Sequence, residues 1–179
     1  RQSDIVISAG NTGALLSISY IVLRTIEGIS RPAMTAYFPT KKGETAMLDL
    51  GANIECDSKN LVDFAFMGSA FSRIILKSKN PSVGLLNVGA EAQKGNSILQ
   101  EAAAHLSNAS NELNYFGFVE GNDIAEGNVD VIVTDGFSGN VALKTAEGTA
   151  KLVTYLLEKS FKSSIFSKIG YLFSKNGLK

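Results

Sequence analysis

Short apolar runs alternate along the chain with longer segments in which apolar residues recur every three or four positions. The short runs are rich in β-branched residues and end in glycine or polar residues, which is typical of buried strands. We predict strands over residues 4–8, 33–38, 45–50, 83–88, 115–119 and 129–134. We predict helices over residues 12–27, 58–76, 96–106 and 139–162. This alternation predicts an α/β fold with a mostly parallel sheet and flanking helices.

The turn Lys41-Lys42-Gly43-Glu44 separates the second and third predicted strands. So short a connection joins antiparallel neighbours, and we therefore expect one antiparallel hairpin in the sheet.

Two predicted helices carry an apolar stripe. The stripe of residues 58–76, which we expect to form core or a subunit contact, consists of Leu61, Phe64, Gly68, Phe71 and Ile75. The stripe of residues 139–162, which we expect to pack inward, consists of Ala146, Ala150, Val153, Leu157 and Phe161.

Composition narrows the class of protein. The 179 residues suit one domain, and 45% apolar with 19% charged residues is a globular balance. The 17 basic and 17 acidic residues cancel, which argues against a general nucleic-acid binder. One cysteine and one histidine exclude an internal disulfide and a Cys/His metal cluster, so we expect a cytoplasmic protein without a metal. The chain opens without methionine, and its closing stretch, residues 174–179, lacks a natural helix stop, so we expect a fragment with material missing at both ends.

Ligands of open α/β sheets bind outside the carboxyl ends of the strands. The first such loop contains Ser8, Gly10, Asn11, Thr12 and Gly13. Its glycines let the backbone approach a ligand, and the amides at the following helix N-terminus favour an anion. The alternative is that Asn11 or Thr12 simply caps the helix.

The second and third loops offer further candidates. Asp49 is the penultimate residue of an apolar strand and needs partners if buried, so it either ties loops together or faces a ligand. Asn53 follows the Gly51 turn, which turn chemistry alone would also explain. In the third loop, which also contains Asn87 and Glu91, Lys94 precedes a helix and is unfavourable there unless an anion lies between. The alternative is a solvated lysine without a role.

The fourth loop follows the strand 129–134 and contains Asp135 and Ser138, of which Ser138 is the expected helix cap. Asn140 and Lys144 lie four residues apart and therefore on one helix face. A lysine and an amide beside one strand end suit a phosphate or a carbonyl oxygen.

No covalent nucleophile is evident. Cys56 lies between Glu55 and Asp57, which would raise the pKa of its thiol, and His105 falls inside a helix with nothing to pair it with a serine. A reaction here would need a substrate that is itself a nucleophile, such as phosphate.

Five motifs, in this order, resemble the PlsX family of phosphate acyltransferases of bacterial phospholipid synthesis: SAGNTGAL, LDLGAN, FAFMG, GLLNVGAEAQKGN and VTDGFSGNVALKTAEG. The resemblance covers nearly the whole chain. The resemblance implies that inorganic phosphate attacks the thioester of fatty acyl carrier protein to give acyl phosphate, without a cofactor. It also implies a homodimer at the membrane surface, and a downstream glycerol-3-phosphate acyltransferase that uses the product.

The fold that the resemblance implies is isocitrate/isopropylmalate-dehydrogenase-like and is shared with phosphotransacetylases. Their Asp-x-x-x-Gly-Asn-x-x-x-Lys pattern is met by Asp135, Gly139, Asn140 and Lys144. The N-terminal Asp-Ala-Met-Gly-Gly-Asp loop of the family and its C-terminal portion are absent from this chain.

From the residue patterns and the family resemblance together, we expect Asn140, Lys144 and Asp135 to be catalytic. Asn140 would stabilise the thioester oxyanion, Lys144 would offset charge on phosphate, and Asp135 would orient one of them. We expect a phosphate and substrate site formed by Ser8, Gly10, Asn11, Thr12, Gly13, Asp49, Asn53, Asn87, Glu91 and Lys94. The alternatives are a phosphotransacetylase or phosphotransbutyrylase acting on short acyl-CoA, a dehydrogenase of the related fold, which lacks its dinucleotide fingerprint here, and a membrane scaffold.

We divide the chain into an α/β core, residues 1–162, and a basic amphipathic helical segment, residues 163–179. From Lys159 to Lys179 there are five lysines and no acidic residue. Between them lie the apolar residues that we expect to contact an anionic membrane on its inner face, Phe161, Ile165, Phe166, Ile169, Leu172 and Phe173. The alternative is a helix that packs on a second subunit or on missing chain.

Overall fold

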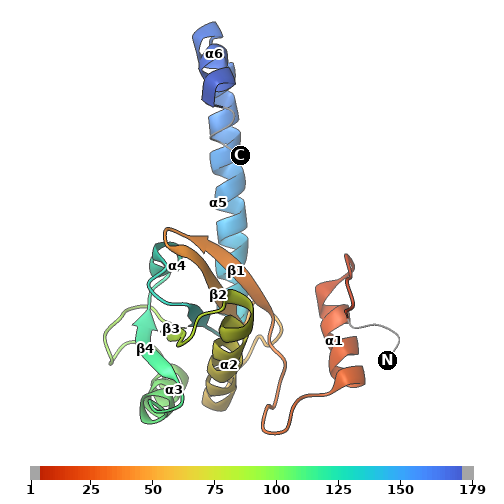
Figure 1. The fold of residues 1–179 in the computed structure, drawn as a ribbon, viewed down its shortest axis with the longest axis vertical. Helices are drawn as coiled ribbons and strands as arrows, with labels where there is room; N and C mark the ends of the chain where they lie inside the picture. Colours follow the sequence, from red (N-terminus) through yellow and green to blue (C-terminus); the bar gives the residue numbers. More distant parts are fainter. Residues whose placement is uncertain (1–4, 175–179) are drawn as a thin grey trace. The chain divides into compact units, whose positions relative to one another are not determined.

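In a computed structural model, which describes residues 5–174, five strands form one sheet in the order β1-β2-β5-β3-β4. The strands are β1 (Thr35–Thr40), β2 (Gly43–Leu48), β3 (Ser82–Leu86), β4 (Asn114–Val119) and β5 (Val131–Val133). β1 and β2 pair antiparallel across the turn between Thr40 and Gly43, and every other pairing is parallel. The predicted hairpin and the mostly parallel sheet are confirmed (Figure 1).

The helices are α1 (Thr12–Leu23), α2 (Ser58–Phe71), α3 (Ser97–Asn108), α4 (Asp123–Glu126), α5 (Gly136–Lys162) and α6 (Ile165–Ser174), and α2 continues as a π-helix, η1 (Ser72–Leu76). None of the helices between residues 5 and 174 combines the length and apolar character needed to cross a bilayer.

The core lies between the sheet and α2 and α3. Leu61 and Phe64 of α2 are buried, and Gly68 lets the helix approach the sheet, since a Cβ there would lie 2.5 Å from Val131 Cγ1. The predicted stripe is therefore core over most of its length. Ile75 departs from it and is 54% exposed, because the helix widens into η1 and its periodicity changes.

The first predicted strand is wrong for the residues that the structure describes, because residues 5–8 form no strand, while residue 4 lies outside the described range. A strand needs a partner, and this segment pairs with neither edge strand, β1 or β4. Ile5, Val6 and Ile7 are all exposed. α1, which ends at Leu23 instead of residue 27, likewise buries none of its residues.

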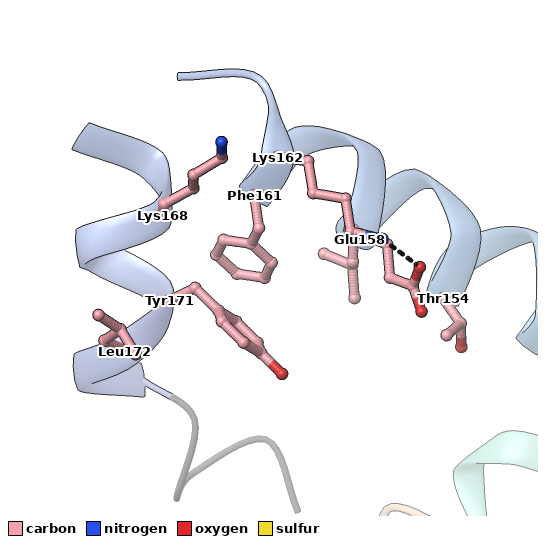
Figure 2. Close-up of a pocket in the computed structure, with 8 residues that line it drawn as sticks. Thr154, Glu158, Phe161, Lys162, Lys168, Tyr171 and Leu172 are labelled. Atoms are coloured by element: carbon pink, nitrogen blue, oxygen red, sulfur yellow. Dashed lines mark hydrogen bonds and ion pairs between the residues drawn. The ribbon is translucent and has the colours of Figure 1, made fainter. Parts of the chain in front are cut away.

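The chain divides into a compact unit up to Asn140 and a second unit from Val141 onward. In the second unit, Phe161 of α5 faces Tyr171 of α6, with ring centroids 5.1 Å apart (Figure 2). The two helices enclose a groove of about 630 Å³. The α5 stripe does not pack inward as predicted, since Ala146, Ala150, Val153 and Leu157 are exposed.

Candidate active site

A cleft opens at the carboxyl edge of the sheet, where the loops after β2, β3, β4 and β5 meet the first turns of α3 and α5. It consists of two adjoining hollows of about 530 Å³ and about 600 Å³. The two hollows share four wall residues: Asn96, Leu99, Asp135 and Ser138. This edge is where open α/β sheets bind their ligands.

The N-terminus of α5 forms one wall of the cleft. Asp135 Oδ1 accepts a hydrogen bond from Ser138 N at 2.9 Å, and the Asp135 carbonyl accepts one from Gly139 N at 2.9 Å. Asp135 therefore caps the helix, which begins three residues before the predicted start, and Ser138 lies within the first turn instead of capping it. Among the described residues, the Phe137 N–H has no hydrogen-bond acceptor and remains available to a ligand.

The N-terminus of α3 forms the facing wall. Asn96 Oδ1 accepts a hydrogen bond from Leu99 N at 2.9 Å and caps the helix. Lys94 and Glu91, both exposed, lie in the loop just before this cap, and Lys94 N donates to the Glu91 carbonyl at 3.0 Å. Because helix N-termini carry partial positive charge, two of them at one cleft favour an anion there.

Asp49 is fully buried and holds the loops next to the cleft in place. Its Oδ1 accepts from Met34 N and Ala52 N at 2.9 and 3.0 Å, and its Oδ2 accepts from Asn53 N and Asn53 Nδ2 at 2.7 and 2.8 Å. Asp49 thus ties loops together, and its predicted contact with the substrate stays a prediction.

Asn53 continues this framework into α5. Its Nδ2 also donates to the Pro32 carbonyl at 2.8 Å, and its own carbonyl accepts from Gly136 N at 2.8 Å. A Cβ on Gly139 would collide with the Asp49 carbonyl oxygen, so only glycine fits there. Asp49 and Asn53 thus position the first turn of α5.

Asn87 closes the loop after β3. It is buried, its Nδ2 donates to the Lys94 carbonyl at 3.1 Å, and its Oδ1 accepts from Val88 N at 2.8 Å. Gly95 is required beside it, since φ is +88° and a Cβ would lie 2.5 Å from Asn87 Oδ1. Asn87 lines the larger hollow and sets the path of the loop that carries Lys94.

Asn140 is exposed on α5 beside Gly51, whose φ is +123°. No hydrogen bond joins its side-chain amide to another residue of the described chain. Lys144 belongs to the second unit, where its Nζ lies 3.0 Å from Glu147 Oε2. In the structure the Asp135 carboxylate caps α5. The expectation that it also orients Asn140 or Lys144 stays a prediction.

The loop from Ser8 to Gly13 makes only local hydrogen bonds. Asn11 Oδ1 accepts from Ala14 N at 3.0 Å and caps α1, and Ser8 Oγ accepts from Gly10 N at 3.1 Å. The whole loop is exposed, and no hydrogen bond between described residues joins it to the cleft. In the structure Asn11 therefore acts as a helix cap, as the alternative prediction stated. The predicted binding of an anion by this loop, including Thr12, stays a prediction.

Cys56 lines the smaller hollow with a thiol that is poorly suited to attack. Burial is the largest of the effects that raise its pKa to about 11, with Asp49 and Asp135 adding to it and the Gly136 amide and Arg31 opposing it. The predicted direction is correct, but burial, and not the flanking acids, is the main cause.

Sequence reasoning missed the apolar lining of the smaller hollow: Ile54, Leu61, Ile98, Leu99 and Phe137. Ile98 and Phe137 each occupy the second position of their helix and are exposed, by 37% and 63%. The sequence did contain a signal for these two residues, because each is an apolar residue placed directly after the polar and glycine residues of a strand-to-helix loop. Within residues 5–174, no three His, Cys, Asp or Glu side chains gather to form a metal site.

Comparison with known proteins identifies the family of this chain. A family model described as "Fatty acid synthesis protein" matches residues 1–179. A curated phosphate acyltransferase of Rhodospirillum centenum is 60% identical over 167 residues, covering 93% of this chain and 47% of the relative. Another, from Paramagnetospirillum magneticum, is 56% identical over 173 residues, covering 97% and 49%. The chain thus spans about half the length of the curated relatives it matches.

Two solved phosphotransacetylases share the fold. The enzyme of Streptococcus pyogenes has a TM-score of 0.63 at 16% identity, covering 80% of this chain and 49% of that one. The EutD phosphotransacetylase of Staphylococcus aureus has a TM-score of 0.59 at 19% identity, covering 74% and 46%. The predicted phosphotransacetylase-related fold class is confirmed.

Proposed function

The chain belongs to the PlsX family of phosphate acyltransferases, and from this membership we propose that the complete protein transfers a long-chain acyl group from acyl carrier protein to inorganic phosphate. The product would be an acyl phosphate, a substrate for glycerol-3-phosphate acylation in phospholipid synthesis.

One observation about the cleft supports the proposal most strongly: the N-termini of α3 and α5 form facing walls of it. Phosphate carries between one and two negative charges near neutral pH, and helix N-termini stabilise such an anion. Lys94, exposed in the loop before α3, adds a mobile positive charge. The loop from Ser8 to Gly13 is a further proposed phosphate contact.

The reaction needs no protein nucleophile. A phosphate oxygen forms a bond to the thioester carbonyl carbon, the carbon–sulfur bond breaks, and the electron pair leaves with the thiolate. The proton that the new acyl phosphate sheds goes to this thiolate, which balances the step. Negative charge develops on the carbonyl oxygen, and the Asn140 amide and the Phe137 N–H are the proposed donors to it.

Lys144 is proposed to offset charge on the attacking phosphate, which requires that it exchange its ion pair with Glu147 for the substrate. Because that pair is exposed, the exchange costs little. Further parts of the proposal are a homodimer and a peripheral association with an anionic membrane on its cytoplasmic face.

The test is the release of free carrier protein from hexadecanoyl carrier protein by the complete protein, with and without phosphate. We expect phosphate-dependent release, and a loss of at least about tenfold in Lys144→Ala and in Asn140→Ala. Lys151→Ala, an exposed lysine on the same helix, is the matched control and should retain activity. Phosphate-independent release, or a preference for short acyl-CoA, would contradict the proposal.

A further inference from the structure

No hydrogen bond fixes the orientation of the Asn140 side chain. Among the residues that the structure describes, its amide group has no hydrogen-bond partner. A side chain that turns freely about χ1 is spread over several staggered rotamers. A donor to a developing charge is most effective when it is already held in place before the reaction. The packing around Asn140 therefore decides how well its amide serves the proposed reaction.

The side chains of Asn140 and Met34 border the same space beside Gly51. Gly51 has a φ of +123° and leaves this space open, because it has no side chain. A Cβ on Gly51 would lie 3.4 Å from Met34 Cε, and 3.5 and 3.6 Å from Asn140 Cβ and Cγ. The terminal methyl group of Met34 therefore limits how far the Asn140 amide can turn across Gly51.

Met34 is tied on both sides to the loop after β2. Its N–H donates to Asp49 Oδ1 at 2.9 Å, and its carbonyl accepts from Leu50 N at 3.1 Å. Two residues earlier, the Pro32 carbonyl accepts from Asn53 Nδ2 at 2.8 Å. The backbone of Met34 is thus fixed, and the length of its half-buried side chain sets how closely the methyl group approaches its neighbours.

We propose that Met34 is a positioning residue, whose methyl group holds the Asn140 amide in the rotamer that donates to the oxyanion. This inference rests on the proposed acyl transfer, in which Asn140 is a donor, and adds the group that orients it. Leucine has a similar volume and apolar character and can take the place of Met34. Alanine is too short to reach across Gly51.

A double-mutant cycle in the complete protein tests the role of Met34. Met34→Ala should lower kcat for phosphate-dependent release of carrier protein at least about threefold and leave the KM for phosphate near the wild-type value. Met34→Leu is the matched control and should retain the wild-type kcat. In an Asn140→Ala background, Met34→Ala should lower kcat no further, because no amide is left to position.

A wild-type kcat in Met34→Ala, or the same loss of kcat with and without Asn140, would overturn the positioning role and leave the proposed function standing. Complete wild-type protein that is inactive with every donor in the presence of phosphate would instead contradict the proposed function.

Nuclear magnetic resonance gives an answer that does not depend on turnover. With ¹⁵N-labelled asparagine, the side-chain signal of Asn140 is the one that disappears in Asn140→Ala. Its order parameter should fall in Met34→Ala and stay at the wild-type value in Met34→Leu. The signal of Asn87, which is buried and bonded to the Lys94 carbonyl, should not change in either variant. An unchanged order parameter of Asn140 in Met34→Ala, or an equal fall at Asn87, would overturn the inference.

Discussion

Asp49 is the residue on which the edge of the cleft depends. It is fully buried, and four N–H donors point at its two oxygens. In Asp49→Asn one oxygen becomes an NH₂ group that faces donors, so hydrogen bonds are lost and not merely weakened. We expect a loss of about 2–4 kcal/mol in the free energy of unfolding, measured by urea denaturation.

Asp57→Asn is the control for the same chemical change, because Asp57 is an exposed helix cap and asparagine caps equally well. It should cost less than about 0.5 kcal/mol. Equal losses in the two variants would contradict the role of Asp49.

Cys56 predicts a pH dependence of chemical reactivity. Burial disfavours the thiolate and raises the pKa of the thiol from 9.0 to about 11. At pH 8 the thiolate fraction is therefore about a hundredfold lower than for an ordinary thiol. We expect slow alkylation by iodoacetamide at pH 8, with a rate that keeps rising up to about pH 11.

The same shift links folding to pH. Because the folded pKa lies above the unfolded one, the stability from the neutral thiol is fully present below pH 9 and is lost as pH rises through about 11. Alkylation of the folded protein at pH 8 as fast as that of glutathione would contradict this environment.

At the scale of elements, the pattern of apolar residues predicted most of the fold because it reports burial. β5 is a fully buried apolar run, β3 is buried in its centre, and β2 is buried from Thr45 to Leu48; each was predicted to within a few residues. Residues 5–8 carry the same pattern and form no strand, because pairing depends on a neighbour that local sequence does not reveal. α4, a single turn from Asp123 to Glu126, is too short to show periodicity.

α6 carries the proposed membrane contact. Ile165, Phe166, Leu172 and Phe173 are more than two-thirds exposed, whereas Phe161, also predicted to contact the membrane, packs on Tyr171. In a helix these exposed residues and Ile169 fall within one arc, the pattern of an interfacial helix. We expect Phe166→Glu combined with Phe173→Glu to reduce flotation with phosphatidylglycerol vesicles at least about tenfold.

Ser167→Glu combined with Ser174→Glu changes the net charge equally on the opposite side of α6 and should reduce flotation much less. A similar reduction in both double variants would mean that charge, and not the apolar face, governs the association.

At the scale of the whole molecule, the sequence predicted which edge of the sheet carries the cleft. It did not predict which residues hold the loops in place and which line the cleft. Polar residues after strands singled out the right loops, because strand ends of a parallel sheet converge. Which polar atoms are engaged could not be predicted, since these residues are held by partners distant in the sequence, as Asn53 is by Pro32 and Gly136. The apolar residues that line the smaller hollow were missed because they come from three separate segments.

The exposed apolar stripe of α5 is a candidate contact of the proposed homodimer, because a second copy of the chain would cover apolar side chains that are exposed in this one. Val153 is 49% exposed on that stripe, and Tyr155, 60% exposed, lies nearly opposite on the same helix. If the stripe is the dimer contact, Val153→Lys places a charge in an apolar interface and should raise the dimer dissociation constant at least about tenfold. Tyr155→Lys carries the same charge outside it and should leave the dissociation constant near the wild-type value. Light scattering over a concentration series measures both, and equal effects would exclude this face.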